Sequence, residues 1–222
     1  IIMDMLGWGV AIFFVAISFL IILPLLFFIS RASEKPTAHR EQLHTIKAIK
    51  IAFSDRSYTL LFFGFFVCGF HVQFIQTHLP AYITDEGLAP IIGAWSLALI
   101  GLFNIGGSFL SGWSGQIYSK PKLLAGIYAS RAVVITIFIL TPLSEPSVLV
   151  FSAAMGILWL STVALTTGLV AQTQGLKFLS TLVGLVFFSH QVGGFLGAWL
   201  GGRLYDLTGN YEAMWIAAIL FG

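Results

Sequence analysis

Charged residues are scarce in this chain. Aspartate, glutamate, lysine and arginine together make up only 9% of its 222 residues, whereas a soluble domain contains about 25%. Hydrophobic residues make up 58%, and the mean hydropathy is +0.94. This composition excludes an ordinary soluble domain and gives no basis for nucleic-acid binding. It indicates an all-α, polytopic membrane protein whose helices form a bundle in the lipid bilayer.

Cysteine is nearly absent, and acidic residues are missing from the apolar segments. The single cysteine, Cys68, cannot form an internal disulfide, and we interpret it as a small buried hydrophobe. The chain has no G-x-S-x-G and no H-E-x-x-H motif, and no intramembrane carboxylate is available to assist a histidine. These absences disfavour a hydrolase, so we expect no enzymatic activity, no cofactor and no metal site.

Long apolar runs dominate what is present. A membrane-spanning helix needs about 20 mostly apolar residues, and we predict spans at about 6–30, 57–79, 90–113, 122–141, 147–171 and 178–202, with a further one beginning near Met214. We expect Pro24 to kink the first span and Pro80 to lie just past the end of the second. Because the chain begins at Ile1 and ends inside an apolar segment, we expect it to be a fragment.

The positive charges lie almost entirely on one side of the predicted spans. Nine Lys and Arg residues fall in the connectors 31–56, 114–121 and 172–177 or at their edges, against one in the alternate connectors. The positive-inside rule places the 31–56 side in the cytoplasm. Within that connector, Ala38–Phe53 is either a short amphipathic helix on the membrane surface or part of a solvated linker.

Two glycine-rich segments resemble each other at an offset of 86 residues. Gly107 aligns with Gly193, Phe109 with Phe195 and Trp113 with Trp199, without a gap. The first copy is predicted to end on the cytoplasmic side and the second outside. Two related helices of opposite direction are what an inverted-topology repeat predicts. The alternative is chance similarity between two helices that both use glycines for close packing.

Three stretches carry a family resemblance: FIQTHLPAYITDEGL at 74–88, LIGLFNIGGSFLSGWSGQIYSKPKLL at 99–124 and FFSHQVGGFLGAWLGGRLYDLTGNY at 187–211. The chain resembles the carboxy-terminal half of a major facilitator superfamily transporter of the monocarboxylate-porter-like, prokaryotic branch. GWSGQIYSKPK is similar to the superfamily's cytoplasmic loop motif, although Gln116 and Ser119 replace the usual charged residues.

The resemblance implies a domain organisation and a fold. Residues 1–30 would be family helix six, 31–56 the cytoplasmic central connector, and 57–222 the carboxy-terminal half with its last helix truncated. The half would contain a 3+3 inverted repeat, and an amino-terminal half would be a missing partner. The resemblance also implies an inner-membrane location in a prokaryote.

Polar side chains inside the spans are the candidate substrate-binding residues, because polar groups at membrane depth usually face a bundle interior or a cavity. His190 lies about 12 residues, roughly 18 Å, into its predicted helix, near the midplane, and Gln191 follows it. His71 and Gln73 lie on opposite faces of the 57–79 helix. For His190, an interhelical hydrogen bond is the alternative role.

Three further candidates lie on the middle spans: Asn104, Arg131 and Trp159. The repeat aligns Asn104 with His190, so each copy places one polar residue near mid-membrane. Arg131 is the one formal charge within a span, which makes it a functional candidate. The resemblance places its helix at the periphery, so a structural role is equally open. Trp159 is either a pore residue or a packing residue.

These residues favour secondary active transport of a small organic anion, a monocarboxylate or dicarboxylate, by alternating access. The proton is a candidate coupling ion, since the reference pKa of an imidazole, the side chain that His190 carries, lies near neutrality. The alternative is a haem-binding membrane electron carrier that uses His71, His78 and His190 as intramembrane imidazoles. The spacing of the first two along one helix gives no obvious pair across a bundle.

Overall fold

The computed structural model describes residues 10, 13, 17 and 38–221 of the chain. The chain divides into two compact units, Ile1–His44 and Thr45–Gly222. The predicted first span at 6–30 lies almost wholly outside the described residues, as do Pro24 and residues 31–37 of the connector.

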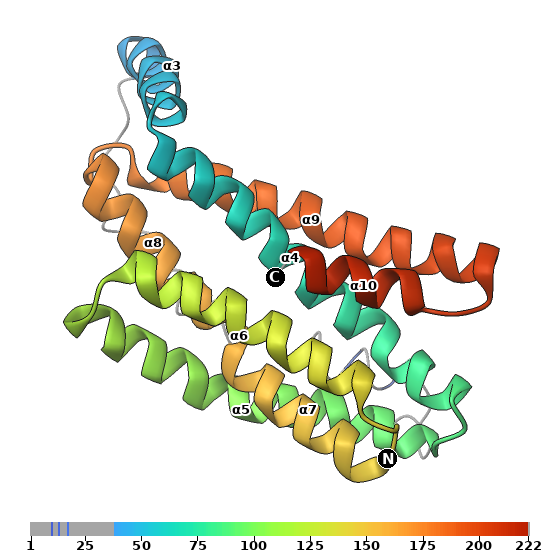
Figure 1. The fold of residues 1–222 in the computed structure, drawn as a ribbon. Helices are drawn as coiled ribbons and strands as arrows, with labels where there is room; N and C mark the ends of the chain where they lie inside the picture. Colours follow the sequence, from blue (N-terminus) through green and yellow to red (C-terminus); the bar gives the residue numbers. More distant parts are fainter. Residues whose placement is uncertain (1–9, 11–12, 14–16, 18–37, 222) are drawn as a thin grey trace. The chain divides into compact units, whose positions relative to one another are not determined.

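Within the described residues the second unit consists of α-helices joined by short loops and contains no strand (Figure 1). Its helices are the end of α3 (Ala38–Ser54), then α4 (Arg56–Asp85), α5 (Pro90–Ile117), α6 (Lys120–Leu140), α7 (Glu145–Leu158), α8 (Ser161–Gln174), α9 (Leu179–Thr208) and α10 (Glu212–Phe221). Among the described helices, five stretches are long and apolar enough to cross a membrane, with α7 and α8 counted together. The predicted helical membrane bundle is confirmed.

Helix ends follow the local chemistry of the sequence. Asp55 precedes α4, and its carboxylate accepts a hydrogen bond from the Ser57 N–H at 2.9 Å, which satisfies one of the free donors of the first turn. Pro90 and Pro121 occupy first-turn positions of α5 and α6, where a missing N–H costs nothing. Gly209 ends α9 in the left-handed conformation, at a φ of 73°.

The predicted end of the second span before Pro80 is wrong, because α4 continues through Pro80 to Asp85. Proline removes one backbone hydrogen bond, but a helix in a membrane tolerates it when neighbouring groups compensate. The Thr84 hydroxyl donates to the Pro80 carbonyl at 3.0 Å, although this bond does not replace the one that the Gln76 carbonyl loses at the proline. Gly93 of α5 lies directly against the proline, so packing between the helices supports this part of α4.

The predicted continuous helix at 147–171 is broken at Trp159 and Leu160 into α7 and α8 (Figure 1). Gly156 lies one turn before the break, and no proline lies between Ser147 and Gly222. Side chains of other helices contact the break at the Leu158 and Trp159 carbonyls and at the Leu160 N–H.

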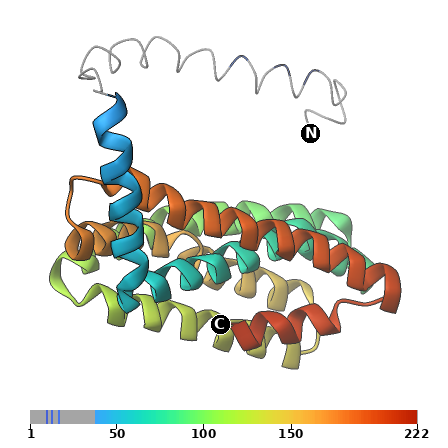
Figure 2. The same cartoon turned by 90° about the horizontal axis from the view of Figure 1, so that it is seen from above.

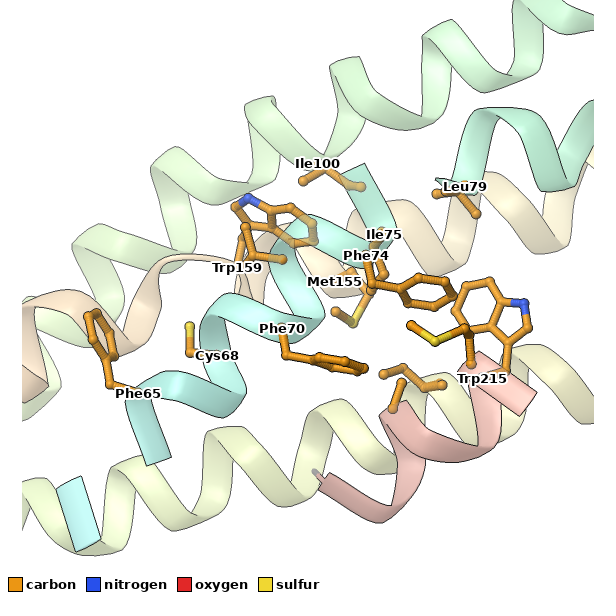
Figure 3. Close-up of a cluster of buried hydrophobic side chains, with 14 of the residues drawn as sticks. Phe65, Cys68, Phe70, Phe74, Ile75, Leu79, Ile100, Met155, Trp159 and Trp215 are labelled. Atoms are coloured by element: carbon orange, nitrogen blue, oxygen red, sulfur yellow. The ribbon is translucent and has the colours of Figure 1, made fainter. Parts of the chain in front are cut away.

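Two helix pairs organise the unit. Helix α4 packs along α9, and α5 packs along α7 and α8, as both views show (Figures 1 and 2). Between the pairs lies an apolar interior in which side chains from several helices meet, including Phe74 with Trp215 and Met155 near Trp159 (Figure 3). Many large apolar side chains point outward instead, as lipid-facing helices require.

The two pairs repeat the same glycine contacts. A Cβ at Gly107 of α5 would overlap the Ile157 backbone of α7, and a Cβ at Gly193 of α9 would overlap the Phe66 backbone of α4. In each pair, the backbones of the two helices therefore lie in contact at one of the two aligned glycines, as small residues allow in membranes. The α5–α7 pair therefore corresponds to the α9–α4 pair, and this correspondence supports the predicted inverted repeat.

Helix α3 covers the segment for which the sequence left a surface helix and a linker open. The segment is helical over Ala38–Ser54. Ala52 is buried, whereas Ile46 and Ile51 are exposed. Its location on a membrane surface stays a prediction.

Candidate functional site

A polar groove with aromatic walls runs along the α4–α9 pair. It encloses about 530 Å³ and is lined by side chains from both helices: Gln73 from α4 and Gln191, Gly194, Phe195, Ala198 and Trp199 from α9. The close approach of the two helices brings Gln73 and Gln191 to the same groove. Their side chains are the only carboxamides among these lining residues.

The shape of the groove depends on a small residue between two polar ones. Gly194 lies beside Gln73, where a Cβ would sit 3.4 Å from the glutamine Cβ. The Phe195 and Trp199 rings lie parallel, with centroids 6.2 Å apart, and both are more than half exposed. The groove therefore combines amide donors and acceptors with a flat apolar wall.

Chemically, the groove can recognise a small polar solute without carrying a formal charge of its own. Each carboxamide offers two N–H donors and one carbonyl acceptor. Gln73 already donates to the Thr77 hydroxyl at 3.1 Å, which fixes its orientation and leaves the second N–H free. A carboxylate can accept hydrogen bonds from such donors, and the aromatic wall can contact a short alkyl group.

His190 lies next to this groove on a different face of α9. It is half-buried, and its ring packs against Phe65, with centroids 4.8 Å apart. Because successive helical residues are rotated by about 100°, His190 points toward the α4 contact while Gln191 faces the groove.

The structure does not bring His71 to the groove. His71 is fully buried, and its Nε2 lies 2.7 Å from the Ala218 carbonyl of α10. His78 lies on the same face of α4 as His71, and its Nε2 is 2.8 Å from the Ala198 carbonyl of α9. Both imidazoles therefore join α4 to a neighbouring helix, His71 to α10 and His78 to α9.

The other three candidates meet at the break between α7 and α8. Arg131 of α6 donates to the Leu158 carbonyl through Nε at 3.2 Å and through Nη2 at 2.6 Å, and Nη2 also donates to the Trp159 carbonyl. The Asn104 Oδ1 of α5 accepts from the Leu160 N–H at 3.0 Å. Trp159 is buried inside the unit (Figure 3).

The seven candidates thus divide into separate places. Gln73 and Gln191 share the groove, with His190 beside it; Arg131, Asn104 and Trp159 share the helix break; His71 faces α10. Phe195 and Trp199 were not predicted as site residues. A signal was available, because both lie in the aligned repeat and at helical spacing from Gln191.

The described residues contain no group of three or more His, Cys, Asp or Glu side chains arranged to hold a metal ion. The Nε2 atoms of His71 and His78 already face backbone carbonyls. Neither Nε2 atom is therefore available as an axial ligand in this arrangement.

Comparisons with known proteins agree with this architecture. Residues 1–198 match the family model described as Major Facilitator Superfamily. The chain is similar to the MFS-type transporter YcxA of Bacillus subtilis (strain 168), with 27% identity over 167 residues, which cover 73% of this chain and 40% of the relative.

Two mammalian relatives extend the comparison. The chain is similar to Monocarboxylate transporter 13 of Rattus norvegicus and of Bos taurus, with 29% identity over 157 residues in each case. These alignments cover 69% of this chain and 36% of each relative. The chain therefore spans well under half the length of the curated relatives it matches.

Proposed function

Because the chain belongs to the Major Facilitator Superfamily, we propose that the whole protein is a secondary transporter of a small organic anion, a monocarboxylate or dicarboxylate. The similarity to proteins named monocarboxylate transporter 13 supports this substrate class. In this proposal residues 1–30 are the sixth helix, 31–56 the cytoplasmic connector and 57–222 the carboxy-terminal half. The protein would lie in the cytoplasmic membrane of a prokaryote.

One observation carries the substrate proposal: two carboxamides from different helices converge in a groove beside a half-buried imidazole. Gln73 and Gln191 would donate hydrogen bonds to the substrate carboxylate, and the Phe195–Trp199 wall would contact its carbon chain. His190 would supply positive charge when it is protonated, which links the anion to a proton.

Alternating access would come from movement of this half against the amino-terminal half. Phe195 and Trp199 of α9 and their repeat equivalents Phe109 and Trp113 of α5 are all more than half exposed. These aromatic residues would contact the other half or lipid. The groove would then be closed on its open side by the other half of the transporter.

The test is uptake by the full-length protein in liposomes. Radiolabelled pyruvate, lactate and oxalate would be supplied outside, with an inward proton gradient or with unlabelled anion inside. We expect saturable uptake of at least one of them, and lower uptake by the His190→Ala variant. No uptake of any of the three would reject the substrate class. Unchanged uptake by the variant would remove His190 from the mechanism.

A further inference from the structure

The broken helix leaves backbone groups that need partners. The last carbonyls of α7 lack backbone N–H donors because the helix stops at Trp159 and Leu160. The carboxyl terminus of a helix also carries about half a negative charge. Side chains from other helices meet these groups. Arg131 donates hydrogen bonds to the Leu158 and Trp159 carbonyls, and the Asn104 Oδ1 accepts one from the Leu160 N–H.

Arg131 is a permanent cation, and within the described part of the chain no carboxylate lies beside it. Its side chain is fully buried, and a guanidinium does not lose its proton in proteins. No Asp or Glu occurs between Glu86 and Glu145 or between Glu145 and Asp206, so the middle of the half contains no acidic counter-ion. The partners of the guanidinium are two backbone carbonyls and the Tyr128 ring, whose centroid lies 5.4 Å away.

The guanidinium also has hydrogen-bond donors that are not satisfied. Its Nη1 is buried without a hydrogen-bond partner among the described residues. An arginine held only for packing would be costly at this depth, because a charged side chain inside a membrane is unfavourable unless it is paired. The carbonyl end of α7 offsets that cost. Broken helices of transporters use such carbonyl ends to coordinate cations.

We propose that the carboxyl end of α7 is a cation site and that Arg131 is its tethered occupant. Two carbonyl oxygens on one side and an aromatic face on the other suit a planar, delocalised cation. Arg131 is therefore a positioning residue: it holds the break between α7 and α8 in one arrangement by filling the site. When the side chain is removed, free guanidinium is the ligand that fits the vacancy.

Cys68 provides a reporter of the break that is independent of transport. Its thiol lies 3.3 Å from the hydroxyl of Thr162, in the first turn of α8, and the residue is fully buried. Opening of the break would expose it to N-ethylmaleimide, which forms a sulfur–carbon bond while the thiol proton passes to the reagent. The reaction is read in the purified full-length protein with every other cysteine replaced by serine.

We expect Arg131→Ala to raise the alkylation rate of Cys68 by about tenfold or more, the factor that one hydrogen bond to a charged group represents. Millimolar guanidinium chloride should return the rate toward that of the unsubstituted protein. Sodium chloride and choline chloride at the same concentration should not. Arg131→Lys should be intermediate, because a point charge replaces a planar fork.

Asn104→Ala is the matched control, since it disrupts the same break without emptying the cation site. It should raise the alkylation rate, and guanidinium should not restore it. The thermal unfolding midpoint provides a second readout: guanidinium should raise it for Arg131→Ala and not for Asn104→Ala. If Arg131→Ala does not fold, failure of added guanidinium during purification to recover folded protein counts against the site. Equal responses to guanidinium, sodium and choline, or rescue of Asn104→Ala, would overturn the proposal.

Discussion

The carbonyl group of His190 on α9 lies directly against Gly69 on α4, so closely that a Cβ at position 69 would overlap it. Gly193 and Gly197 approach the backbones of Phe66 and Phe70 in the same way. The α4–α9 contact is therefore made by backbone atoms over about two helical turns. This contact sets the separation between Gln73 and Gln191, which lie on the groove side of the same pair.

Substitution of Gly69 by alanine should separate α4 from α9. The new methyl group meets backbone atoms that cannot rotate away, and such overpacking costs about 1–3 kcal/mol. We expect a thermal unfolding midpoint lower by several degrees and a loss of substrate uptake. Gly64→Ala on the same helix is the control, because its Cβ would meet only the Tyr128 ring, at 3.9 Å. Equal stability of the two variants would contradict the backbone contact.

The repeat makes a second packing prediction on α5. Gly107→Ala would press on the Ile157 backbone, whereas nothing lies within 4 Å of a Cβ at the adjacent Gly106. Alanine favours a helix over glycine by about 1 kcal/mol, so Gly106→Ala should leave the thermal midpoint unchanged or slightly higher. Gly107→Ala should lower it. Measurement of both midpoints in one detergent decides whether the aligned glycine is the packing residue.

Much of the fold could be predicted from the sequence because membrane helices leave a direct signature in composition. The apolar runs located every spanning segment in the described residues, and charge or proline marked several ends. The aligned glycines indicated close helix packing in both copies of the repeat, but they did not indicate which helices they contact. These features depend on local sequence and on the bilayer, so no knowledge of the tertiary structure was needed.

The helix break and the division of the site residues depended on tertiary contacts. Residues 147–171 read as one continuous span, since nothing at Trp159 or Leu160 disfavours a helix. Only the contacts from Asn104 and Arg131 show why the helix can end there. Similarly, helical periodicity separated His71 from Gln73, but it gave no information on which face meets α10 and which meets the groove.

The contact of Asn104 with the break predicts a loss of stability in Asn104→Ala. Removal of the side chain leaves the Leu160 N–H without its acceptor, and an unsatisfied buried donor costs about 1–3 kcal/mol. The thermal midpoint should fall by several degrees. Ser108→Ala is a suitable control, because Ser108 donates to the same Oδ1 atom at 3.2 Å and its loss leaves the Leu160 N–H bonded. If Ser108→Ala lowers the thermal midpoint as much as Asn104→Ala does, loss of the contact to Leu160 does not explain the destabilisation.

The groove makes the last prediction, which concerns transport. Gln191→Leu keeps the approximate size of the side chain and removes its N–H donors, so a carboxylate would lose one charge-assisted hydrogen bond. Such a bond contributes about 1.5–3 kcal/mol, which corresponds to a rise of roughly ten- to a hundredfold in the KM for uptake. Gln73→Leu should have an effect in the same direction.

Gln76→Leu separates this effect from a general response to lost polarity. Gln76 lies on the same helix as Gln73 and is exposed, but it does not line the groove. Its variant should retain the KM of the unsubstituted protein, measured with the same labelled anion in liposomes of the same lipid. If Gln76→Leu raises the KM as much as Gln191→Leu, the two groove carboxamides are not the substrate ligands. If Gln191→Leu changes only the maximal rate of uptake, Gln191 instead acts in the conformational step. The loss of a substrate-binding contact is expected to change KM.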